Sequence, residues 1–493
     1  MMLNFSELKL GELALGDLPK SVQITLDDGN LLTIQSVARM LPNARVVVRG
    51  SVNQQPVYAK IYIGHRASIH AAREAGGVKK LVTAHILTPK LLQETSYQNQ
   101  PVIVYAAINN AVNAEDFIRR GDYLSRREMA IKLVQTVAEH HAANLMQTDI
   151  HLKNFLVAHE SIYTIDGDGI VKTSSQHQKQ RNLATFFSKF EVLNDDFMQT
   201  SLQAYCAALG INFSNQYCTK MHFLTQKIRQ KTASDYADKK VFRQCTDVNI
   251  HALEDTFSTV SGEASNINLP SNVQALDNLF NAQNLLKNGN TCTVALTEIS
   301  GKKIVIKRYN IKGFWHGVSR ALRKTRAAAS WANAYRLKIL DIATAAPIAL
   351  IETRHLALGK YGLKGQAYFL AEYVDAPDIA QFFAECADKT ARAETVKNIS
   401  TLFYKLYLLK ISHGDMKASN IKVVDNQPVL IDLDSMIQHR FDKLALNGHA
   451  RDLRRFMQNW QDSPALYNTF VKAFKVIYAD DAPLKLAQIE QIK

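Results

Sequence analysis

The alternation of apolar and polar positions predicts two similar series of elements, one in each half of the chain. In both halves a short apolar strand ends in a lysine: VYAK contains Lys60 and IVIK contains Lys307. An apolar, alanine-rich segment of helical period follows each strand and ends in a turn and a proline, with Pro89 and Pro347 as the stops. A β-rich run comes next in each half, PVIVYAAI and AYFLAEYV. The order of predicted elements therefore repeats.

The same polar landmarks follow these strands at equal separations in both halves. QTDIHLKNFLV is followed by YTIDGDG in the first half, and SHGDMKASNIKVV is followed by VLIDLDS in the second. The landmarks are Asp149, Asn154 and Asp166 in the first half and Asp415, Asn420 and Asp432 in the second. Each series closes with a further echo, RNLATFF from Arg181 and RDLRRFM from Arg451, which we interpret as starts of helices. Agreement at both separations indicates a duplication.

A stretch without apolar period separates the two series. SGEASNINLPSN, residues 261–272, is rich in Ser, Asn, Gly and Pro, as linkers are. We therefore predict two homologous domains, at residues 1–255 and 265–493, and a length of 493 residues agrees with two domains. Short strands come first in each domain and helices dominate afterwards. This order predicts an α+β fold with two tandem bilobal domains, each with a sheet lobe and a helical lobe.

Composition and charge narrow the class of protein. Apolar residues make up 47% of the chain and charged residues 21%, as in globular proteins. The net charge of +14 predicts a positive field that attracts nucleic acid, a phosphorylated substrate or an anionic membrane. Five cysteines without C-x-x-C spacing argue against a disulfide framework or a zinc ribbon and favour a reducing compartment.

Targeting signals are not evident in the sequence. The first twenty residues mix acids and bases among apolar positions, unlike a secretory signal. No run approaches the roughly 18–20 apolar residues of a membrane-spanning helix. We therefore expect a cytoplasmic location, with peripheral contact at a membrane surface as an open alternative.

The repeated polar residues suit phosphoryl transfer. This reaction needs a cation on the non-transferred phosphates, oxygen ligands for Mg²⁺ and a carboxylate that orients the attacking hydroxyl. Lys60 and Lys307 provide the cation from a rigid strand, and Asp149 and Asp415 are the candidate catalytic carboxylates. The candidate metal ligands are Asn154, Asp166, Asn420 and Asp432. H-E-x-x-H, G-x-S-x-G and Walker-type motifs do not occur, which leaves few competing chemistries.

A D-x-x-x-x-N loop followed one short hairpin later by an aspartate resembles the catalytic loop and metal site of the protein-kinase-like superfamily. An I-D-x-D motif, and no evident A-P-E segment, resemble small-molecule and lipid-sugar kinases more than eukaryotic protein kinases. RALRKTRAAASWANAYRL before a proline-marked turn, HGDMKASN, IDLD and the R-[ND]-L helix are most similar to the lipopolysaccharide core kinases, the Kdo/heptose kinase family.

This resemblance implies a function and a setting. Kinases of this family use ATP and Mg²⁺ to phosphorylate core sugar hydroxyls of a lipid-linked acceptor. The implied partner is lipopolysaccharide core or another anionic glycolipid, at the cytoplasmic face of the inner membrane. The resemblance also places Lys417 where it touches the transferred phosphate.

The strand lysines differ in the acid available to hold them. Glu74 comes fourteen residues after Lys60 in a helical segment and is suited to form an ion pair with it. The corresponding position in the second half is Ser330, and no acid occurs from residue 299 to residue 340. The side chain of Lys307 must then be positioned by other residues, or by a later acid such as Glu352.

The two D-x-x-x-x-N loops and their flanking residues differ as well. Gln147 stands where the second half has His413, and His151 stands where it has Lys417. Neither half has an obvious glycine-rich loop, although NGNTCTVAL at 288–296 predicts a short turn before the lysine strand. The differences leave open which half is active. A tandem pseudokinase that acts as a scaffold or regulator, and a kinase of a soluble small molecule, remain alternatives.

A basic run without acids lies between residues 302 and 336. Its members are Lys302, Lys303, Lys307, Arg308, Lys312, Arg320, Arg323, Lys324, Arg326 and Arg336. Such a run is either a solvated helix face or a patch for phosphorylated oligosaccharide or anionic lipid, with Phe314 and Trp315 as interfacial aromatics. Nucleic acid is disfavoured because no recognised binding motif accompanies the charge.

Overall fold

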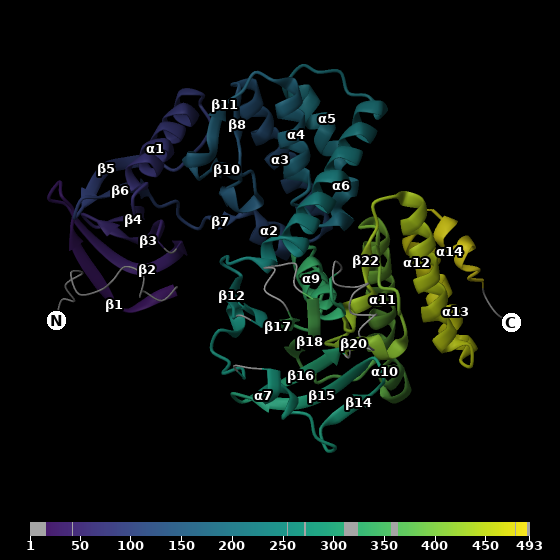
Figure 1. The fold of residues 1–493 in the computed structure, drawn as a ribbon. Coiled ribbons are helices and arrows are strands. Elements are labelled where there is room, and N and C mark those ends of the chain that lie inside the picture. The colour runs from purple at the N-terminus through teal and green to yellow at the C-terminus, as the bar shows by residue number, and fades with distance from the viewer. Residues whose placement is uncertain are drawn as a thin grey trace. The chain divides into compact units, whose positions relative to one another are not determined.

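The structure, a computed structural model, describes most of the chain. The described residues are 16–41, 43–253, 255–270, 273–309, 324–355, 363–478 and 480–490. The chain divides into two compact units, Met1–Arg229 and Gln230–Lys493 (Figure 1). Both units mix strands and helices, so the predicted α+β class is confirmed. The division falls inside a helix, ahead of the 261–272 stretch.

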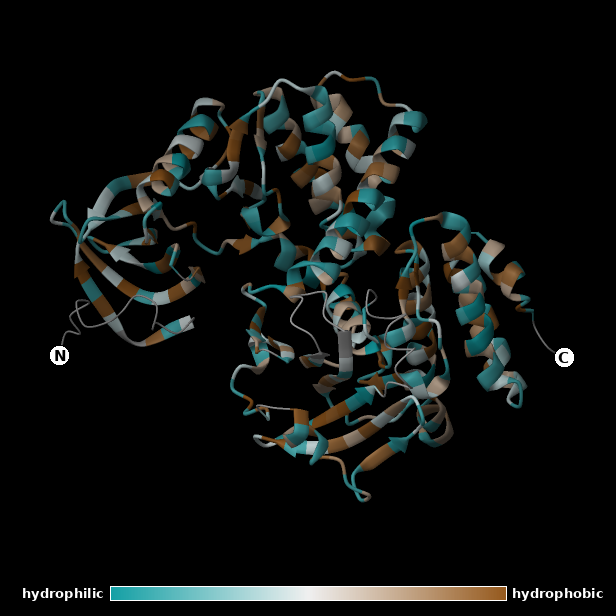
Figure 2. Cartoon of the chain, viewed as in Figure 1, coloured by the Kyte–Doolittle hydropathy of each residue, from teal (hydrophilic) through white to brown (hydrophobic). Residues whose placement is uncertain are grey.

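The first unit begins with a six-stranded antiparallel sheet of order β1-β2-β3-β4-β6-β5. Its strands are β1 (Gly16–Thr25), β2 (Leu31–Leu41), β3 (Arg45–Val52), β4 (Gln55–Tyr62), β5 (Leu91–Tyr97) and β6 (Gln100–Ala106). Buried and accessible positions alternate along β3, as expected for a strand with one face on a core. Figure 2 shows the matching alternation of hydropathy along β2 to β4. Helix α1 (Ala67–Thr83) contacts β4 and β6.

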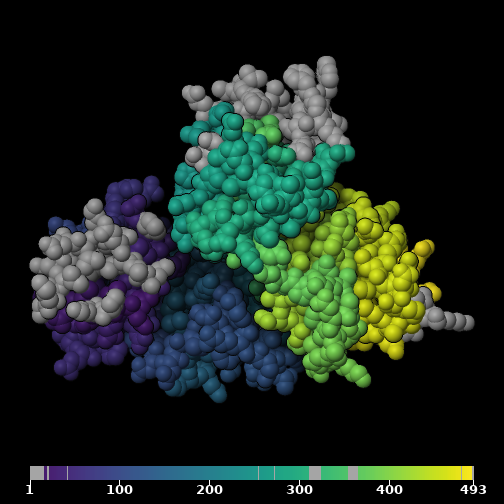
Figure 3. Space-filling view, turned by 90° about the horizontal axis from the view of Figure 1, so that it is seen from below, coloured from purple at the N-terminus to yellow at the C-terminus, as the bar shows by residue number. Residues whose placement is uncertain are grey.

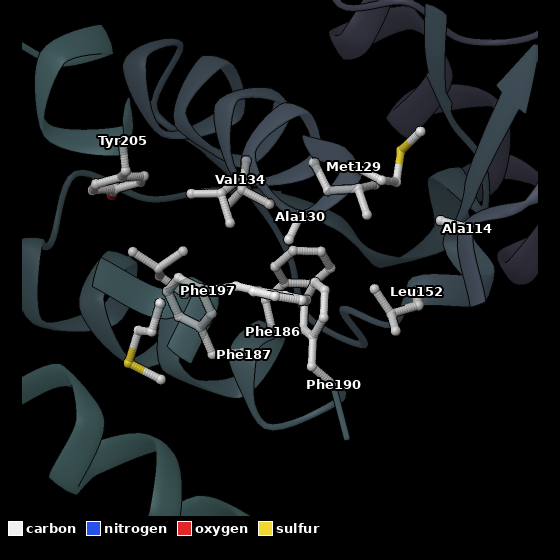
Figure 4. Close-up of a cluster of buried hydrophobic side chains, with 14 of the residues drawn as sticks. Ala114, Met129, Ala130, Val134, Leu152, Phe186, Phe187, Phe190, Phe197 and Tyr205 are labelled. Atoms are coloured by element: carbon white, nitrogen blue, oxygen red, sulfur yellow. The ribbon is translucent and has the colours of Figure 1, made fainter. Parts of the chain in front are cut away.

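Helices follow the sheet in the first unit. They are α2 (Ala114–Arg120), α3 (Tyr123–Ala142), α4 (Gln176–Phe187), α5 (Phe197–Ala208) and α6 (Asn215–Asp238), and the unit boundary lies within α6. Short strands lie among them: β7 (Val112–Asn113), β8 (Leu145–Gln147), β9 (Phe155–Ala158), β10 (Ser161–Thr164) and β11 (Ile170–Lys172). A buried cluster with the rings of Phe186 and Phe190 5.3 Å apart joins α3, α4 and α5 (Figure 4). This core fixes the loop between β8 and β9.

The second unit contains a seven-stranded antiparallel sheet of order β12-β13-β17-β18-β16-β15-β14. Its strands are β12 (Val248–Ala252), β13 (Thr256–Ser261), β14 (Leu285–Asn288), β15 (Cys292–Ile299), β16 (Lys302–Tyr309), β17 (Pro347–His355) and β18 (Leu363–Glu372). β12 precedes the predicted linker and β13 ends at its first residue, yet both pair into this sheet: Val260 of β13 lies opposite Ala349 of β17. The predicted turn at 288–296 is the end of the β14–β15 hairpin.

Helices dominate the later part of the second unit. They are α7 (Val273–Asp277), α9 (Arg326–Ile339), α10 (Ile379–Glu385), α11 (Lys389–Leu408), α12 (Asp442–Met457), α13 (Pro464–Ile477) and α14 (Ala482–Ala487). The short strands are β19 (Ile411–Ser412), β20 (Ile421–Val424), β21 (Gln427–Leu430) and β22 (Ile437–Gln438). Rings of Phe403, Phe456 and Phe470 pack between α11, α12 and α13. Figure 3 shows the residues from α10 to α14, green to yellow, as one continuous mass.

The helices that follow the two lysine strands each end in a turn ahead of the proline, as predicted. α1 ends at Thr83 and α9 at Ile339, each several residues before its proline. Each helix is followed by a residue with positive φ, His85 and Asp341, which turns the chain out of the helix earlier than proline does. The predicted helix starts at Arg181 and Arg451 are wrong, because both residues lie inside α4 and α12. Ser175 caps α4 by accepting a hydrogen bond from Gln178 N.

Within the described ranges, no helix combines the length and the apolar character that a membrane span requires.

Candidate phosphoryl-transfer sites

The first unit brings Lys60, Glu74 and Asp166 together. Lys60 lies in the middle of β4, between its neighbours Val47 on β3 and Ile103 on β6. Lys60 Nζ lies 2.5 Å from Glu74 Oε1 on α1 and 3.1 Å from Asp166 Oδ1. A cation held between two carboxylates on a rigid strand is preorganised to receive a phosphate anion.

Glu74 is almost completely buried, with 1% of its surface exposed, and it is surrounded by donors. Besides Lys60, the Tyr105 hydroxyl donates to Oε1 over 2.9 Å and the Asp168 amide donates to Oε2 over 2.9 Å. A buried carboxylate requires such partners to offset its lost hydration. The contacts fix α1 to both the sheet and the segment that carries Asp166.

Asp166 sits in a left-handed backbone conformation, with φ 70° and ψ 68°. Burial opposes ionisation of its carboxyl, but Lys60 and Arg45 together hold its pKa below the ordinary value. The next residue, Gly167, packs so closely on α1 that a Cβ there would lie 2.4 Å from Glu74 O. A Cβ on Gly77 of α1 would lie 1.8 Å from Gly167 O. Both glycines permit this approach, and the sequence analysis missed them.

The loop between β8 and β9 places Asp149 beside Asn154. Asn154 Nδ2 donates to the Asp149 carbonyl oxygen over 2.7 Å, and the Ile165 amide donates to Asn154 O over 2.9 Å. Asp149 itself is exposed. Gln147 Nε2 donates to Ile165 O over 2.8 Å, which ties the loop to the residue before Asp166. The three landmarks predicted from the first half are therefore neighbours.

His151 follows Asp149 and lies near an acid of α2. Its Nδ1 is 4.0 Å from Glu115 Oε1. Burial, with the nearby Lys189 cation, lowers the pKa of His151 below its usual value. The imidazole is therefore neutral at pH 7 and adds no positive charge beside Asp149.

The second unit repeats the arrangement with different residues. Lys307 Nζ on β16 lies 2.7 Å from Asp432 Oδ1. Asp432 has φ 61° and ψ 61°, the same left-handed conformation as its counterpart in the first unit. Burial opposes its ionisation, but Lys307 holds its pKa below the ordinary value. The lysine strand and the aspartate turn therefore meet in both units.

No helix acid pairs with Lys307 among the residues that the structure describes. The Ser330 hydroxyl on α9 lies 3.1 Å from the Tyr309 hydroxyl, and Glu352 accepts a hydrogen bond from the Thr325 side chain at the start of α9. Among the described residues, the ion pair that Lys307 forms is the one with Asp432. The carboxylate that faces the lysine in the second unit is thus the candidate metal ligand itself.

Two cations lie beside Asp415 in the second unit, one from its D-x-x-x-x-N loop and one from α12. Lys417 Nζ lies 3.2 Å from Asp415 Oδ2, and Arg455 Nε on α12 lies 3.8 Å from Asp415 Oδ1. Asn420 Nδ2 donates to Asp415 O over 2.8 Å and to Asp415 Oδ2 over 3.2 Å. His413 Nε2 lies 3.0 Å from Ile431 O, and this contact matches the one between Gln147 and Ile165 O in the first unit.

Asp452 on α12 anchors the D-x-x-x-x-N loop of the second unit, although it was not among the predicted site residues. Its carboxylate accepts hydrogen bonds from the backbone amides of His413 and Gly414. Burial raises the pKa of Asp452 to about 6. The signal in the sequence was the aspartate of RDLRRFM, which replaces Asn182 of RNLATFF.

The oxygens of Asn420 and Asp432 fit a magnesium ion. The Asn420 amide nitrogen donates to Asp415, which orients the amide oxygen as the atom left for a ligand. The Ile431 amide donates to Asn420 O over 3.0 Å, so the residue before Asp432 is fixed against the loop. Amide and carboxylate oxygens are the ligands that Mg²⁺ prefers.

Much of the predicted basic run is engaged in ion pairs. The described pairs are Lys303 with Asp375, Lys307 with Asp432, Arg308 with Asp277, Lys324 with Asp238, Arg326 with Asp434, and Arg336 with Asp238. Lys312, Phe314, Trp315, Arg320 and Arg323 lie outside the described residues. The described part of the run is therefore largely neutralised by acids from other segments.

A strand lysine, a D-x-x-x-x-N loop and an aspartate after the next hairpin together define a site of the protein-kinase-like class. Residues 281–474 match the sequence model of the lipopolysaccharide kinase (Kdo/WaaP) family. The predicted family resemblance is therefore confirmed for this segment, which contains Lys307, Asp415, Asn420 and Asp432. No curated protein sequence matches the chain.

Several solved structures show distant similarity. One titled "WaaP in complex with acyl carrier protein" has 17% identity and a TM-score of 0.32, covering 41% of this chain and 90% of that one. A co-crystal structure of WbdD with the kinase inhibitor LY294002 has 14% identity and a TM-score of 0.29, covering 39% and 50%. A structure of vaccinia related kinase 3 has 13% identity and a TM-score of 0.27, covering 46% and 78%.

Proposed function

We propose that this protein is an ATP-dependent phosphotransferase that phosphorylates a sugar hydroxyl of lipopolysaccharide core or a related envelope glycolipid. The observation that carries the proposal is the family match over residues 281–474, which includes every candidate site residue of the second unit. The implied setting is the cytoplasmic face of the inner membrane, with the protein bound peripherally. The positive net charge of +14 suits an anionic acceptor.

We assign roles in the second unit from chemistry and position. Lys307 binds the α- and β-phosphates of ATP, and Asp415 orients the attacking sugar hydroxyl and accepts its proton. Asn420 and Asp432 would hold Mg²⁺, which when bound neutralises charge on the phosphates. Lys417 and Arg455, both close to Asp415, attract the phosphoryl group toward the hydroxyl.

We propose further that the chain is a tandem duplication of a bilobal kinase-like domain, at about 1–255 and 265–493. Repeated local geometry supports this: both metal-site aspartates are left-handed, and both loop asparagines donate to the carbonyl oxygen of their aspartate. In the first unit the matching roles fall to Lys60, with Glu74 holding it, and to Asp149, Asn154 and Asp166.

The second unit is our choice for the transferring site. It places Lys417 and Arg455 beside Asp415, whereas the first unit has a neutral His151 in place of Lys417. The lysine of the first loop, Lys153, forms its ion pair with Glu115 instead. A phosphoryl group approaching Asp149 therefore meets less positive charge than one approaching Asp415. Electrostatic stabilisation of the transferred group is the main contribution that a protein makes to this reaction.

Transfer of label from γ-labelled ATP to extracted lipopolysaccharide core tests the proposal. We expect Mg²⁺-dependent labelling that Asp432→Ala lowers on the order of a hundredfold or more. Asp375→Ala, which removes an exposed acid of the same unit, is the matched control and should label as the wild type does. Asp166→Ala should have the smaller effect, so that this variant retains at least about tenfold more transfer than Asp432→Ala does. The reverse ranking of Asp166→Ala and Asp432→Ala would contradict the choice of unit.

A second candidate function is a tandem pseudokinase that serves as a scaffold or regulator. The observation that favours it is Ser330 at the position of Glu74, because no helix acid pairs with Lys307 in the described part of the chain. Saturable ATP binding without transfer to lipopolysaccharide core or to a panel of soluble sugars would favour this function. Transfer to a soluble sugar, with no flotation of the protein on glycolipid vesicles, would instead indicate a small-molecule kinase.

A further inference from the structure

An arginine of α9 holds the turn that carries Asp432 in the second unit. Arg326 is the first residue of α9, and its Nη2 lies 2.7 Å from Oδ2 of Asp434, two residues after Asp432. The Asp434 side chain is only 5% exposed, against 42% for Arg326. The other oxygen of Asp434 accepts a hydrogen bond from the Ser435 hydroxyl over 3.0 Å. A carboxylate buried to this degree needs such partners, so Arg326 stabilises this conformation of the turn.

The same guanidinium also contacts the lysine strand. Arg326 Cζ lies 5.1 Å from the centroid of the Tyr309 ring, and Tyr309 is two residues after Lys307 on β16. A cation over the face of an aromatic ring is attracted by the ring. Arg326 therefore joins three elements, which are α9, the strand that carries Lys307 and the turn that carries Asp432.

Glu74 joins the same three elements in the first unit. It lies on α1, forms an ion pair with Lys60 on β4 and accepts a hydrogen bond from the Asp168 amide, in the turn that carries Asp166. One acid thus connects the helix to the lysine strand and to the aspartate turn.

On α9 this connection is divided among three polar residues. Arg326, Ser330 and Asn333 are spaced by four and then three residues, which places them on one side of the helix. Asn333 Nδ2 donates to the carbonyl oxygens of Leu433 and Met436 over 2.8 Å and 2.9 Å. Of the three side chains, Arg326 is the one that brings a charge to the turn.

The first unit has an arginine in a similar place, although it comes from another element. Arg45 of β3 has its Cζ 5.9 Å from the centroid of the Tyr62 ring, and Tyr62 is two residues after Lys60. Its Nη1 lies 3.2 Å from Asp166 Oδ1. In both units, therefore, an arginine lies over the tyrosine of the lysine strand and pairs with an acid of the aspartate turn. The recurrence of this contact from β3 in one unit and from α9 in the other supports a role for the cation at this place.

We infer that Arg326 is a positioning residue for phosphoryl transfer in the second unit, where it replaces the missing helix acid by holding the aspartate turn instead of the lysine. Its effect on transfer rests on the proposed function. Because Arg326 holds the turn through Asp434, Lys307 needs no partner on the helix and pairs with Asp432. A serine at position 330 is therefore compatible with an active second unit.

Calorimetric titration of the full chain with ATP tests this inference. An Asp166→Ala background weakens the first site, so the gain in affinity from excess EDTA to excess MgCl₂ reports the second. Arg326→Ala should reduce this gain about tenfold, as for the loss of a charge-assisted hydrogen bond. It should change the affinity in EDTA by less than about twofold, because Asp432 acts through the metal. An unchanged gain, or an equal loss of affinity in both conditions, would overturn the inference.

Three further variants in the same background separate other causes. Lys338→Ala removes another cation of α9, which pairs with Glu263 over 2.7 Å, and should leave the gain unchanged. Arg326→Lys keeps the charge and should retain most of the gain. Arg326→Ala combined with Asp434→Asn should lose no more of the gain than Arg326→Ala alone, because the arginine acts through that carboxylate. Additive losses would contradict this route.

Transfer of label to lipopolysaccharide core is measured separately. In a protein that transfers, Arg326→Ala should lower kcat and raise the MgCl₂ concentration needed for half-maximal transfer, and Arg326→Lys should restore both. A wild type that gains ATP affinity from MgCl₂ but transfers no label would count against the proposed acceptor, while the affinities still decide the role of Arg326. If MgCl₂ gave no gain in affinity before Arg326 was changed, the magnesium site and the inference would both be wrong.

Discussion

Asp452 is the residue whose substitution most directly tests how the D-x-x-x-x-N loop of the second unit is held. Its two carboxylate oxygens accept the amides of His413 and Gly414. Asparagine offers one acceptor oxygen and turns an NH₂ group toward the other amide, so Asp452→Asn should lower the free energy of unfolding by about 1–3 kcal/mol. Urea unfolding followed by circular dichroism measures this change.

The matched substitution lies in the first unit. Asn182 Nδ2 donates to Gln147 O, and the Thr148 amide donates to Gly169 O, so that loop does not need a carboxylate. Asn182→Asp would place a buried charge against a carbonyl oxygen and should destabilise the protein as well. Stability equal to wild type in either variant would contradict the account of the two loops.

The raised pKa of Asp452 makes the loss of unfolding free energy in Asp452→Asn depend on pH. Burial raises it to about 6, above the value near 4 of an unfolded chain. Between about pH 4 and pH 6 the folded state therefore holds a proton that the unfolded state has released, and this group's contribution to stability falls as pH rises. Asparagine does not titrate, so Asp452→Asn should cost roughly 1–2 kcal/mol more at pH 4.5 than at pH 7. A loss that grows toward pH 7 would contradict this sign.

At the scale of elements, the approach of α1 to the Asp166 turn depends on one of two adjacent glycines. A Cβ on Gly77 would lie 1.8 Å from Gly167 O, whereas a Cβ on Gly76 meets no atom within 4 Å. Gly77→Ala should therefore cost about 1–3 kcal/mol of unfolding free energy through overpacking. Gly76→Ala should stabilise the helix by about 0.5–1 kcal/mol. Thermal unfolding of the two variants measures both, and equal effects would contradict the close contact.

The elements that the sequence predicted best are those with strong local patterns. The lysine strands and the loops around Asp149 and Asp415 follow from alternation and from residue spacing within one segment. The contacts of Arg45 and Asp452 were not predictable, because they join residues 121 and 39 positions apart in the chain. The turn after α9 was predicted, but not its exact position, which is set by the positive φ of Asp341 several residues before Pro347. Local patterns specify elements, and long-range packing decides which polar groups meet.

At the scale of the molecule, each unit has its own buried cores, such as the cluster around α3 to α5 in the first unit and the cluster beneath β16 to β18 in the second. We therefore expect two calorimetric unfolding transitions. Gly77→Ala should lower the midpoint of one transition and Asp452→Asn the midpoint of the other. A single transition that both variants shift equally would contradict this expectation.

Nucleotide tests the metal requirement of the second unit. A ligand raises the midpoint of the unit that binds it, because it stabilises the folded form alone. ATP with MgCl₂ should raise the transition that Asp452→Asn lowers, because Asn420 and Asp432 would hold the ion beside the phosphates. ATP in excess EDTA should raise that midpoint less, because the charge on the phosphates is then not neutralised. Equal shifts of that transition in MgCl₂ and in EDTA would contradict a magnesium site in the second unit.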